Sequence, residues 1–262
     1  MSKIEDALKK SRSDNSTELV KTSSNVQSYI NSDISLMEYD EQVAIGVLSN
    51  LKIIHYGMKD QKIFSEFRSL RTKLIQKSEN TNLCIMIYSS LPGGGSSYVA
   101  ANLAAAIALD EKKTSLLVNC DFTCKPDYEN LLGQYHGGLI DFLSSDLPVE
   151  DIIYRSGIKR LRIIPAGSTN DTFSEYFTLR KFHELLQQIK GRYSDRYIIL
   201  DAPSAMNPAD IRLLSEFVDF GVLIVPYGKD SLDNIDKASK LISKEKMIGV
   251  VINNIPEIFA GK

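Results

Sequence analysis

The sequence lacks long apolar runs and has few cysteines. No part of its 262 residues approaches the roughly 18 consecutive apolar residues that a membrane-spanning helix needs. The opening residues, MSKIEDALKKSRSD, are charged throughout, unlike the apolar region of a signal peptide. Cys84, Cys120 and Cys124 form no CxxC motif and have no histidine cluster beside them, so we expect buried or idle thiols in a reducing compartment. The sequence therefore predicts a cytoplasmic protein with no transmembrane segment of its own.

An excess of charge of one sign is also missing. The formal net charge is -2, and no basic stripe runs along the chain, so nucleic acid and anionic membrane are not expected partners. Hydrophobic residues make up 43% of the chain and charged residues 24%, which is enough apolar mass for an ordinary globular core.

Residues 1–60 differ from the rest in composition. Ser2 and Glu5 read as a capping box that opens a short helix, and the polar stretch SRSDNSTELVKTSSNVQS that follows suits a flexible linker. We therefore expect an N-terminal extension over 1–60 and a globular domain over 61–262. The extension is interpreted either as a docking element for a partner or as a frayed terminus without a role.

From Gln61 onward the periodicity predicts alternating helices and strands. Ile63, Phe64, Phe67, Leu70 and Leu74 recur at helical spacing and predict a helix that faces the core. The apolar runs of strand length are Leu83–Tyr88, Ser115–Val118, Leu161–Ile164, Tyr197–Leu200, Val222–Val225 and Ile248–Ile252. Helical segments lie between most of them, at Tyr98–Asp110, Leu179–Lys190, Pro208–Phe217 and Leu232–Ser243. This alternation predicts an α/β fold of the P-loop NTPase type, with a mostly parallel sheet and helices on both faces.

The first predicted strand runs into a glycine-rich loop and then a helix, which is the context of a phosphate-binding loop. The loop residues are Pro92, Gly93, Gly94, Gly95, Ser96 and Ser97. The glycines allow a nest of backbone N–H donors, and the helix directs its positive end to the same place. Ser97 stands where a hydroxyl holds Mg²⁺, but Ser96 stands where a phosphate-binding lysine is expected.

Acidic side chains follow two other predicted strands. Asp121 and Asn119 close the run LLVNCD, and Asp201 closes YIILD. A carboxylate at such a strand end holds Mg²⁺ through water in Walker B sites, so Asp121 and Asp201 are the candidate catalytic residues and, with Ser97, the candidate metal ligands. The simpler interpretation of each aspartate is a turn or cap residue.

Several segments in order resemble the cytoplasmic domain of bacterial tyrosine kinases (BY-kinases). FRSLRTKL resembles the activation helix, SSLPGGGSS the Walker A loop, LLVNCD the Walker A′ strand and YIILDAPS the Walker B strand. The resemblance, from about residue 65 to about 253, implies ATP or ADP with Mg²⁺ as cofactor. It also implies a role in capsule or exopolysaccharide export, a membrane polysaccharide co-polymerase of the Wzz type as partner, and self-association through Arg68 and Arg71. Such a domain would lie at the inner membrane through that partner.

The departures from the family pattern predict lost chemistry. Ser96 replaces the loop lysine, Asn119 the first acid of the DxD motif and Thr123 the arginine after it, while Ser65 occupies the glutamate position of the activation helix. No tyrosine follows Tyr227. We therefore expect a degenerate, pseudokinase-like homologue that binds nucleotide weakly or not at all.

Three alternatives remain. The first is an active but divergent kinase or ATPase, in which Lys125 substitutes for the missing lysine. The second is a partitioning ATPase of the ParA or MinD type. It is disfavoured because that group has an additional lysine early in the loop, whereas here Ser89, Ser90 and Leu91 directly precede Pro92. The third concerns only assembly: a monomer or dimer is as compatible with the sequence as a ring, since Ser65 departs from the family pattern.

Overall fold

A computed structural model describes residues 43–77, 82–168, 174–192 and 196–256. The helix and linker expected within residues 1–28 lie outside this part of the chain. Among the described helices, none combines the length and the apolar character needed to span a bilayer.

The centre of the fold is a sheet that comprises seven strands within the described residues, in the order β3-β4-β2-β5-β1-β6-β7. Its strands are β1 (Cys84–Ser89), β2 (Thr114–Asn119), β3 (Tyr154–Arg155), β4 (Leu161–Ile164), β5 (Arg196–Asp201), β6 (Phe220–Pro226) and β7 (Met247–Asn253). β3 pairs antiparallel with β4, and the other pairings are parallel. The six predicted strand runs are confirmed, each within two residues at its ends. β3 was not predicted, because two residues are too few to show a period.

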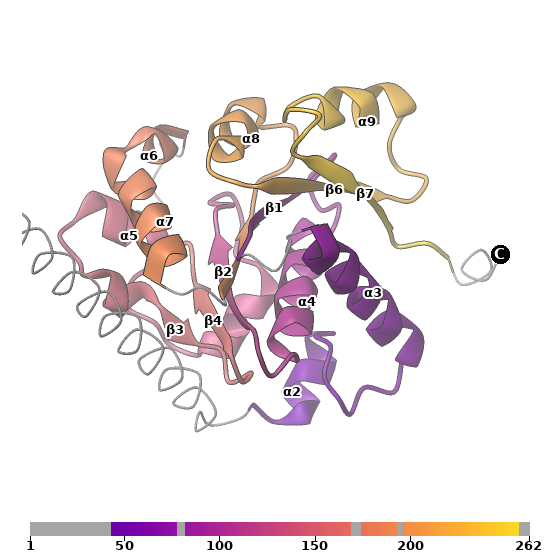
Figure 1. Ribbon diagram of the computed structural model, residues 1–262, viewed down its shortest axis with the longest axis horizontal. Coiled ribbons are helices and arrows are strands. Elements are labelled where there is room, and N and C mark those ends of the chain that lie inside the picture. Colours follow the sequence, from indigo (N-terminus) through magenta and orange to yellow (C-terminus); the bar gives the residue numbers. More distant parts are fainter. Residues whose placement is uncertain (1–42, 78–81, 169–173, 193–195, 257–262) are drawn as a thin grey trace, which may run out of the picture. The chain divides into compact units, whose positions relative to one another are not determined.

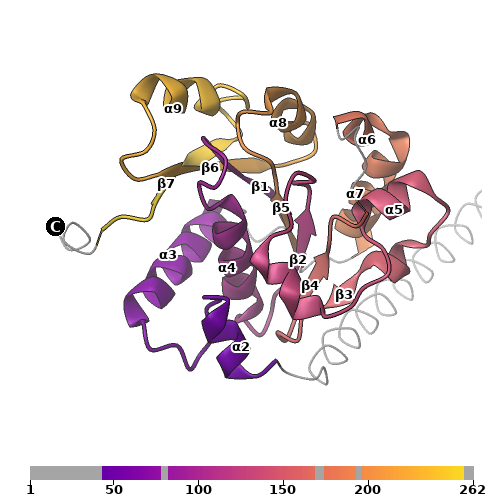
Figure 2. The ribbon, with the colours of Figure 1, turned by 180° about the vertical axis from the view of Figure 1, so that it is seen from behind.

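Helices cover both faces of this sheet. They are α2 (Ile45–Asn50), α3 (Gln61–Lys77), α4 (Ser96–Ala108), α5 (Leu139–Ser144), α6 (Ser174–Thr178), α7 (Arg180–Arg192), α8 (Pro208–Ser215) and α9 (Leu232–Ser239). Two 3₁₀ segments, η1 (Asp127–Leu132) and η2 (Val149–Ile152), complete the described elements. Figures 1 and 2 show α8 and α9 on one side of β6 and β7, with α3 and α4 on the other.

The side chains on the two faces of β1 belong to two separate clusters of buried residues. Met86 and Tyr88 belong to the cluster that includes α5, α7 and α8, whereas Ile85 and Ile87 belong to the cluster formed with α3 and α4. This alternation follows from the period of two along a strand. β1 is buried along its whole length, as expected for a central strand covered on both faces.

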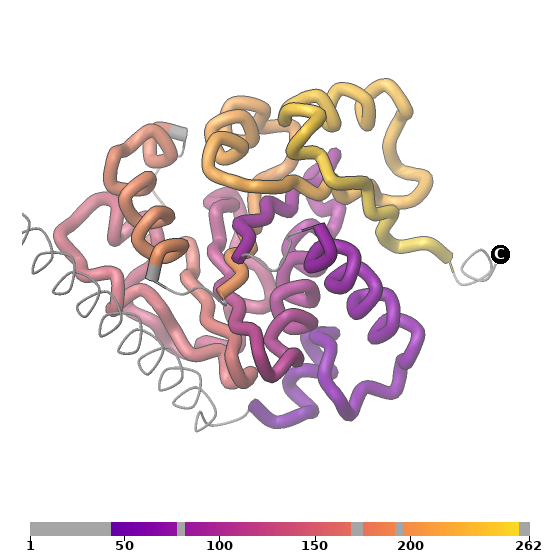
Figure 3. Tube along the Cα trace, in the orientation of Figure 1, coloured from indigo at the N-terminus to yellow at the C-terminus, as the bar shows by residue number. Residues whose placement is uncertain are grey.

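The segment before α3 contributes to the second cluster. Leu48, Ile53 and Ile54 are buried in it, although the sequence interpretation assigned residues up to 60 to the N-terminal extension. The Ile54 N–H donates to Oδ1 of the fully buried Asn102 in α4 at 2.8 Å. The tube trace shows α2, α3 and α4 on the same side of the sheet (Figure 3).

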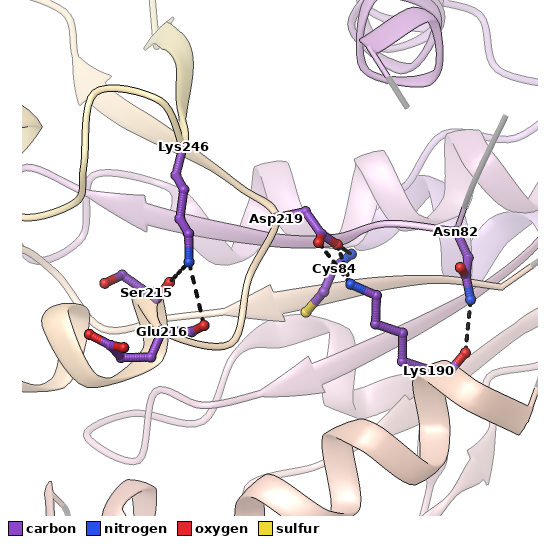
Figure 4. A network of polar contacts seen from close by, with 7 residues as sticks. All are labelled: Asn82, Cys84, Lys190, Ser215, Glu216, Asp219 and Lys246. Atoms are coloured by element: carbon purple, nitrogen blue, oxygen red, sulfur yellow. Dashed lines mark hydrogen bonds and ion pairs between the residues drawn. The ribbon is translucent and has the colours of Figure 1, made fainter. Parts of the chain in front are cut away.

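At the amino ends of the strands, a polar network ties β1 and β6 to α7 (Figure 4). Asp219, just before β6, accepts from the Cys84 N–H at 2.8 Å and from Nζ of Lys190 at 2.7 and 2.8 Å. Nearby, Lys246 donates to the Ser215 carbonyl at 2.7 Å. These contacts lie at the edge of the sheet opposite the glycine-rich loop, so they hold the scaffold rather than the site.

Candidate functional site

Three neighbouring strands deliver the predicted site residues to one edge of the sheet. β5 lies between β2 and β1, and Asp201 is in register with Asn119 on one side and with Ile87 on the other. The glycine-rich loop continues from the same end of β1. The carboxyl edge of an open parallel sheet is where such folds bind ligands. The structure therefore brings together the loop, Asn119, Asp121 and Asp201 at this edge.

The loop has the backbone of a phosphate cradle. Gly93 and Gly95 have φ values of +68° and +94°, a backbone region that residues other than glycine rarely adopt. A Cβ at Gly94 would lie 2.8 Å from the Cβ of Ser89, so the loop is packed tightly against the end of β1. Ser96 begins α4, whose first N–H groups have no partner within the helix and face the loop.

A residue from β7 fixes the shape of this loop. The side-chain amide of Asn253 donates to the Gly94 carbonyl at 3.0 Å, and a Cβ at Gly95 would collide with the same amide. Gly95 is thus required both by its backbone conformation and by the side chain above it. Sequence reasoning missed Asn253, because the contact joins residues 159 positions apart.

Asp201 is fully buried at the end of β5. Its Oδ2 accepts from the Tyr128 hydroxyl at 3.0 Å, whereas its Oδ1 has no hydrogen-bond partner in the described structure. Burial raises the pKa of Asp201 from its ordinary 3.8 to about 7, and the nearby hydroxyls of Ser97 and Tyr128 offset only part of that rise. Near neutral pH the carboxyl is therefore poised between its neutral and ionised forms.

Asp121 is engaged by its own loop. Its Oδ1 accepts from the N–H and the hydroxyl of Thr123 at 3.0 and 2.5 Å, and its Oδ2 accepts from the Cys124 thiol at 3.5 Å. Burial, with a further contribution from Asp121, raises the pKa of the Cys124 thiol to about 12, so this thiol is protonated at neutral pH. Thr123 thus stabilises the turn that holds Asp121.

The Asn119 side chain donates a hydrogen bond to a buried carboxylate that sequence reasoning missed. Its Nδ2 donates to Oε1 of Glu129 at 2.8 Å, and its Oδ1 accepts from the Asp121 N–H at 3.0 Å. Glu129 is 1% exposed and also accepts from the Ala166 N–H at 3.1 Å and from the Tyr135 hydroxyl at 2.7 Å. An aspartate at position 119 would place two carboxylates within hydrogen-bond distance of each other, so the amide is required by its surroundings.

A cleft of about 600 Å³ opens beside the loop. Gly93, Gly95, Ser96 and Ser97 line one part of it, and Asp121, Lys125, Asp127 and Tyr128 line another. Lys125 therefore lines the same cavity as the loop. The sequence alone does not show whether this side chain is near the loop. Its Nζ lies 5.0 Å from the centre of the Tyr135 ring.

The residues at this edge fit a phosphate group and, with fewer ligands, a hydrated Mg²⁺. Positive φ at Gly93 and Gly95 shapes the cradle, and Ser90 Oγ and Asp201 Oδ1 are buried without hydrogen-bond partners in the described structure. Within that structure, no group of three or more His, Cys, Asp or Glu side chains forms a metal cluster. Asp201, Asp121 and the Ser97 hydroxyl would therefore hold an ion that keeps most of its water, as Mg²⁺ commonly does.

Arg68 and Arg71, the two arginines expected at an interface, differ in their exposure and contacts. Arg68 is exposed, with its guanidinium 5.7 Å from the centre of the Phe64 ring. Arg71 instead donates to the Ala106 carbonyl near the end of α4 at 3.0 Å. Arg68 thus faces outward, whereas Arg71 is partly used to hold α3 against α4.

Comparison with known proteins connects this site to a protein family. No protein-family model matches the chain. It is 27% identical to tyrosine-protein kinase YwqD of Bacillus subtilis over 191 residues, which cover 72% of the chain and 79% of YwqD. It is 26% identical to tyrosine-protein kinase CpsD of Streptococcus agalactiae over 221 residues, covering 81% and 93%. The chain is a homologue of bacterial tyrosine kinases. EpsB of Ralstonia nicotianae is 27% identical over 202 residues, which are only 26% of that longer protein.

Solved structures show the same fold. The chimerical protein CapA2B2 superposes with a TM-score of 0.71 at 26% identity, covering 83% of this chain and 93% of CapA2B2. The kinase domain of Escherichia coli tyrosine kinase ETK gives 0.66 at 22% identity, over 73% and 75%. A MinC:MinD cell division complex from Aquifex aeolicus gives 0.51 at 20% identity, over 66% and 69%, a likeness of P-loop fold alone.

Proposed function

We propose that this chain is a degenerate BY-kinase homologue that acts as a regulatory or structural partner in exopolysaccharide or capsule synthesis and export. It keeps the phosphate cradle but hydrolyses ATP weakly or not at all. The observation that carries the proposal is the Asn119–Glu129 contact of 2.8 Å. Where the resembled motif has a carboxylate, this chain has an amide whose donor is already used by a buried glutamate.

The substitution at Ser96 supports the same conclusion. Phosphoryl transfer depends on cations that stabilise the transition-state charge, and one such cation contributes about 10³–10⁵ in rate. Ser96 supplies a hydroxyl at that position and no charge. Nucleotide binding needs the cation less, because the backbone cradle and the end of α4 remain.

The partner that we propose is a membrane polysaccharide co-polymerase of the Wzz type, which would hold the chain at the cytoplasmic side of the inner membrane. The exposed Arg68 on α3 is a candidate contact for self-association. We also propose that residues 1–40 of the N-terminal extension serve as the docking element, because residues 48–54 are part of the core. Co-purification of the full chain with the co-polymerase, compared with a chain that lacks residues 1–40, tests that assignment.

The activity test is Mg²⁺-dependent phosphate release from ATP, together with phosphotyrosine detection, on the full chain. We expect turnover close to the background. Robust release that Asp201→Ala abolishes would contradict a degenerate role and support the second candidate, an active but divergent tyrosine kinase. The observation in favour of that candidate is the retained Asp201, with one oxygen free of hydrogen bonds in the described structure.

A further inference from the structure

The cleft beside the loop contains an uneven set of charges. Asp121 and Asp127 line it, and among its described lining residues Lys125 alone has a positively charged side chain. A nucleotide would add the negative charge of its phosphates to this cleft. Either such a ligand meets Lys125, or the loop binds it with backbone N–H groups alone.

Lys125 is placed so that it can move. It is exposed, it lies in the irregular segment between β2 and η1, and no ion pair to it is found among the described residues. Its contact is with the face of Tyr135, whose hydroxyl is anchored on Glu129 at 2.7 Å. An exposed cation over an aromatic ring is held more weakly than a cation that makes charge-assisted hydrogen bonds to phosphate. The Lys125 ammonium would therefore leave the Tyr135 ring and bind a phosphate in the cleft.

We propose that Lys125 is the phosphate-binding cation of this chain, replacing the lysine that is absent at Ser96, and that the ligand is a nucleoside di- or triphosphate. The inference deepens the proposed function and rests on its phosphate cradle. It concerns binding and adds no catalytic step. Lys125 approaches from the segment after β2, whereas a lysine at position 96 would approach from the start of α4.

The proposal predicts a specific pattern of affinities, measurable by calorimetry on the full chain with Mg²⁺ and ATP, ADP or adenosine. Lys125→Met should weaken ATP and ADP binding by about 10-fold to 100-fold, the loss expected for one charge-assisted contact, and leave adenosine unchanged. Lys125→Arg should retain most of the affinity. Lys244→Met is the matched control, because Lys244 is exposed just before β7, at the amino edge of the sheet.

A double-mutant cycle tests the replacement itself. Ser96→Lys should restore ATP affinity in the Lys125→Met background by more than it raises that of the parent chain, because the two lysines serve the same phosphates. Equal ATP affinity of Lys125→Met and the parent would overturn the proposal, and so would a parent that binds no ATP at millimolar concentration. Neither result touches the proposed function, which fails only if ATP is turned over robustly.

Discussion

The Tyr128 hydroxyl donates to Oδ2 of Asp201 at 3.0 Å, and both side chains are almost completely buried. Tyr128 belongs to η1 and Asp201 ends β5, so this bond joins the segment after β2 to the central strands. It satisfies one oxygen of the carboxylate on which a Walker B metal site would depend. The state of Asp201 is therefore linked to the position of η1.

Removal of that hydroxyl should change the titration of Asp201. In Tyr128→Phe the ionised carboxylate loses a donor, so its pKa should rise above about 7. The free energy of unfolding should fall by about 1–2 kcal/mol at pH 8 and by less at pH 5, where the carboxyl is protonated. Carboxyl carbon NMR shifts and urea unfolding measure the two effects.

The matched control is Tyr88→Phe, which removes an equally buried hydroxyl that donates to the Ala238 carbonyl at 3.0 Å. Its cost should be the same at both pH values, because no carboxylate is involved. A pH-independent cost for Tyr128→Phe as well would contradict the coupling to Asp201.

Asp201 should make the protein less stable as pH rises. Because the folded-state pKa is raised, the folded chain binds more protons than the unfolded chain between about pH 4 and 7, and stability falls through that window. The rise from 3.8 to about 7 corresponds to about 4 kcal/mol at most. Asp201→Asn should therefore be more stable than the parent at pH 8, with an advantage that shrinks by pH 5.

Urea unfolding at both pH values tests this expectation. Asp146→Asn removes an exposed carboxylate and should show no such trend. If Asp201→Asn differs from the parent by the same amount at pH 5 and pH 8, the carboxyl is not poised near neutrality.

Restoring an acid at position 119 should be costly. Asn119→Asp places a second carboxylate against Glu129 and leaves a buried charge unpaired, which should lower the free energy of unfolding by about 3 kcal/mol at pH 8. Glu129→Gln should make the same substitution less harmful. The rescue should be partial, because Ala166 N–H donates to the same oxygen of Glu129 and still needs an acceptor.

Urea unfolding of the two single variants and the double variant supplies the coupling free energy. Purely additive effects would mean that the two side chains do not depend on each other. If the coupling is found, we expect Ser96→Lys to cost less stability than Asn119→Asp.

The network at the opposite edge should affect stability without affecting ligand binding. Asp219→Ala leaves the Cys84 N–H without its acceptor and Lys190 without its partner, so a loss of about 2 kcal/mol is expected. Lys190→Met removes only the ion pair, which is partly exposed, and should cost less than about 1 kcal/mol. Equal losses would indicate that the Cys84 contact contributes nothing.

The sequence predicted the strands, most of the helices and the strand ends that form the site, because local periodicity and the loop glycines carry that information. It did not predict the partners of Asn119 and Asp201, since Tyr128 and Glu129 lie in a 3₁₀ segment whose residues show no regular pattern. Arg71 illustrates the same limit: its spacing from Arg68 is visible in the sequence, but its contact with the Ala106 carbonyl depends on how α3 packs against α4.

The hydrogen bond between Asn253 and the Gly94 carbonyl has a consequence for synthesis of the chain. Translation produces the loop first and Asn253 159 positions later. A nascent chain still tethered to the ribosome therefore lacks the amide that hydrogen-bonds to the loop. The loop can reach its final shape only when almost the whole domain has been made. The phosphate binding proposed for this loop would thus be a property of the finished chain, not of its early segments.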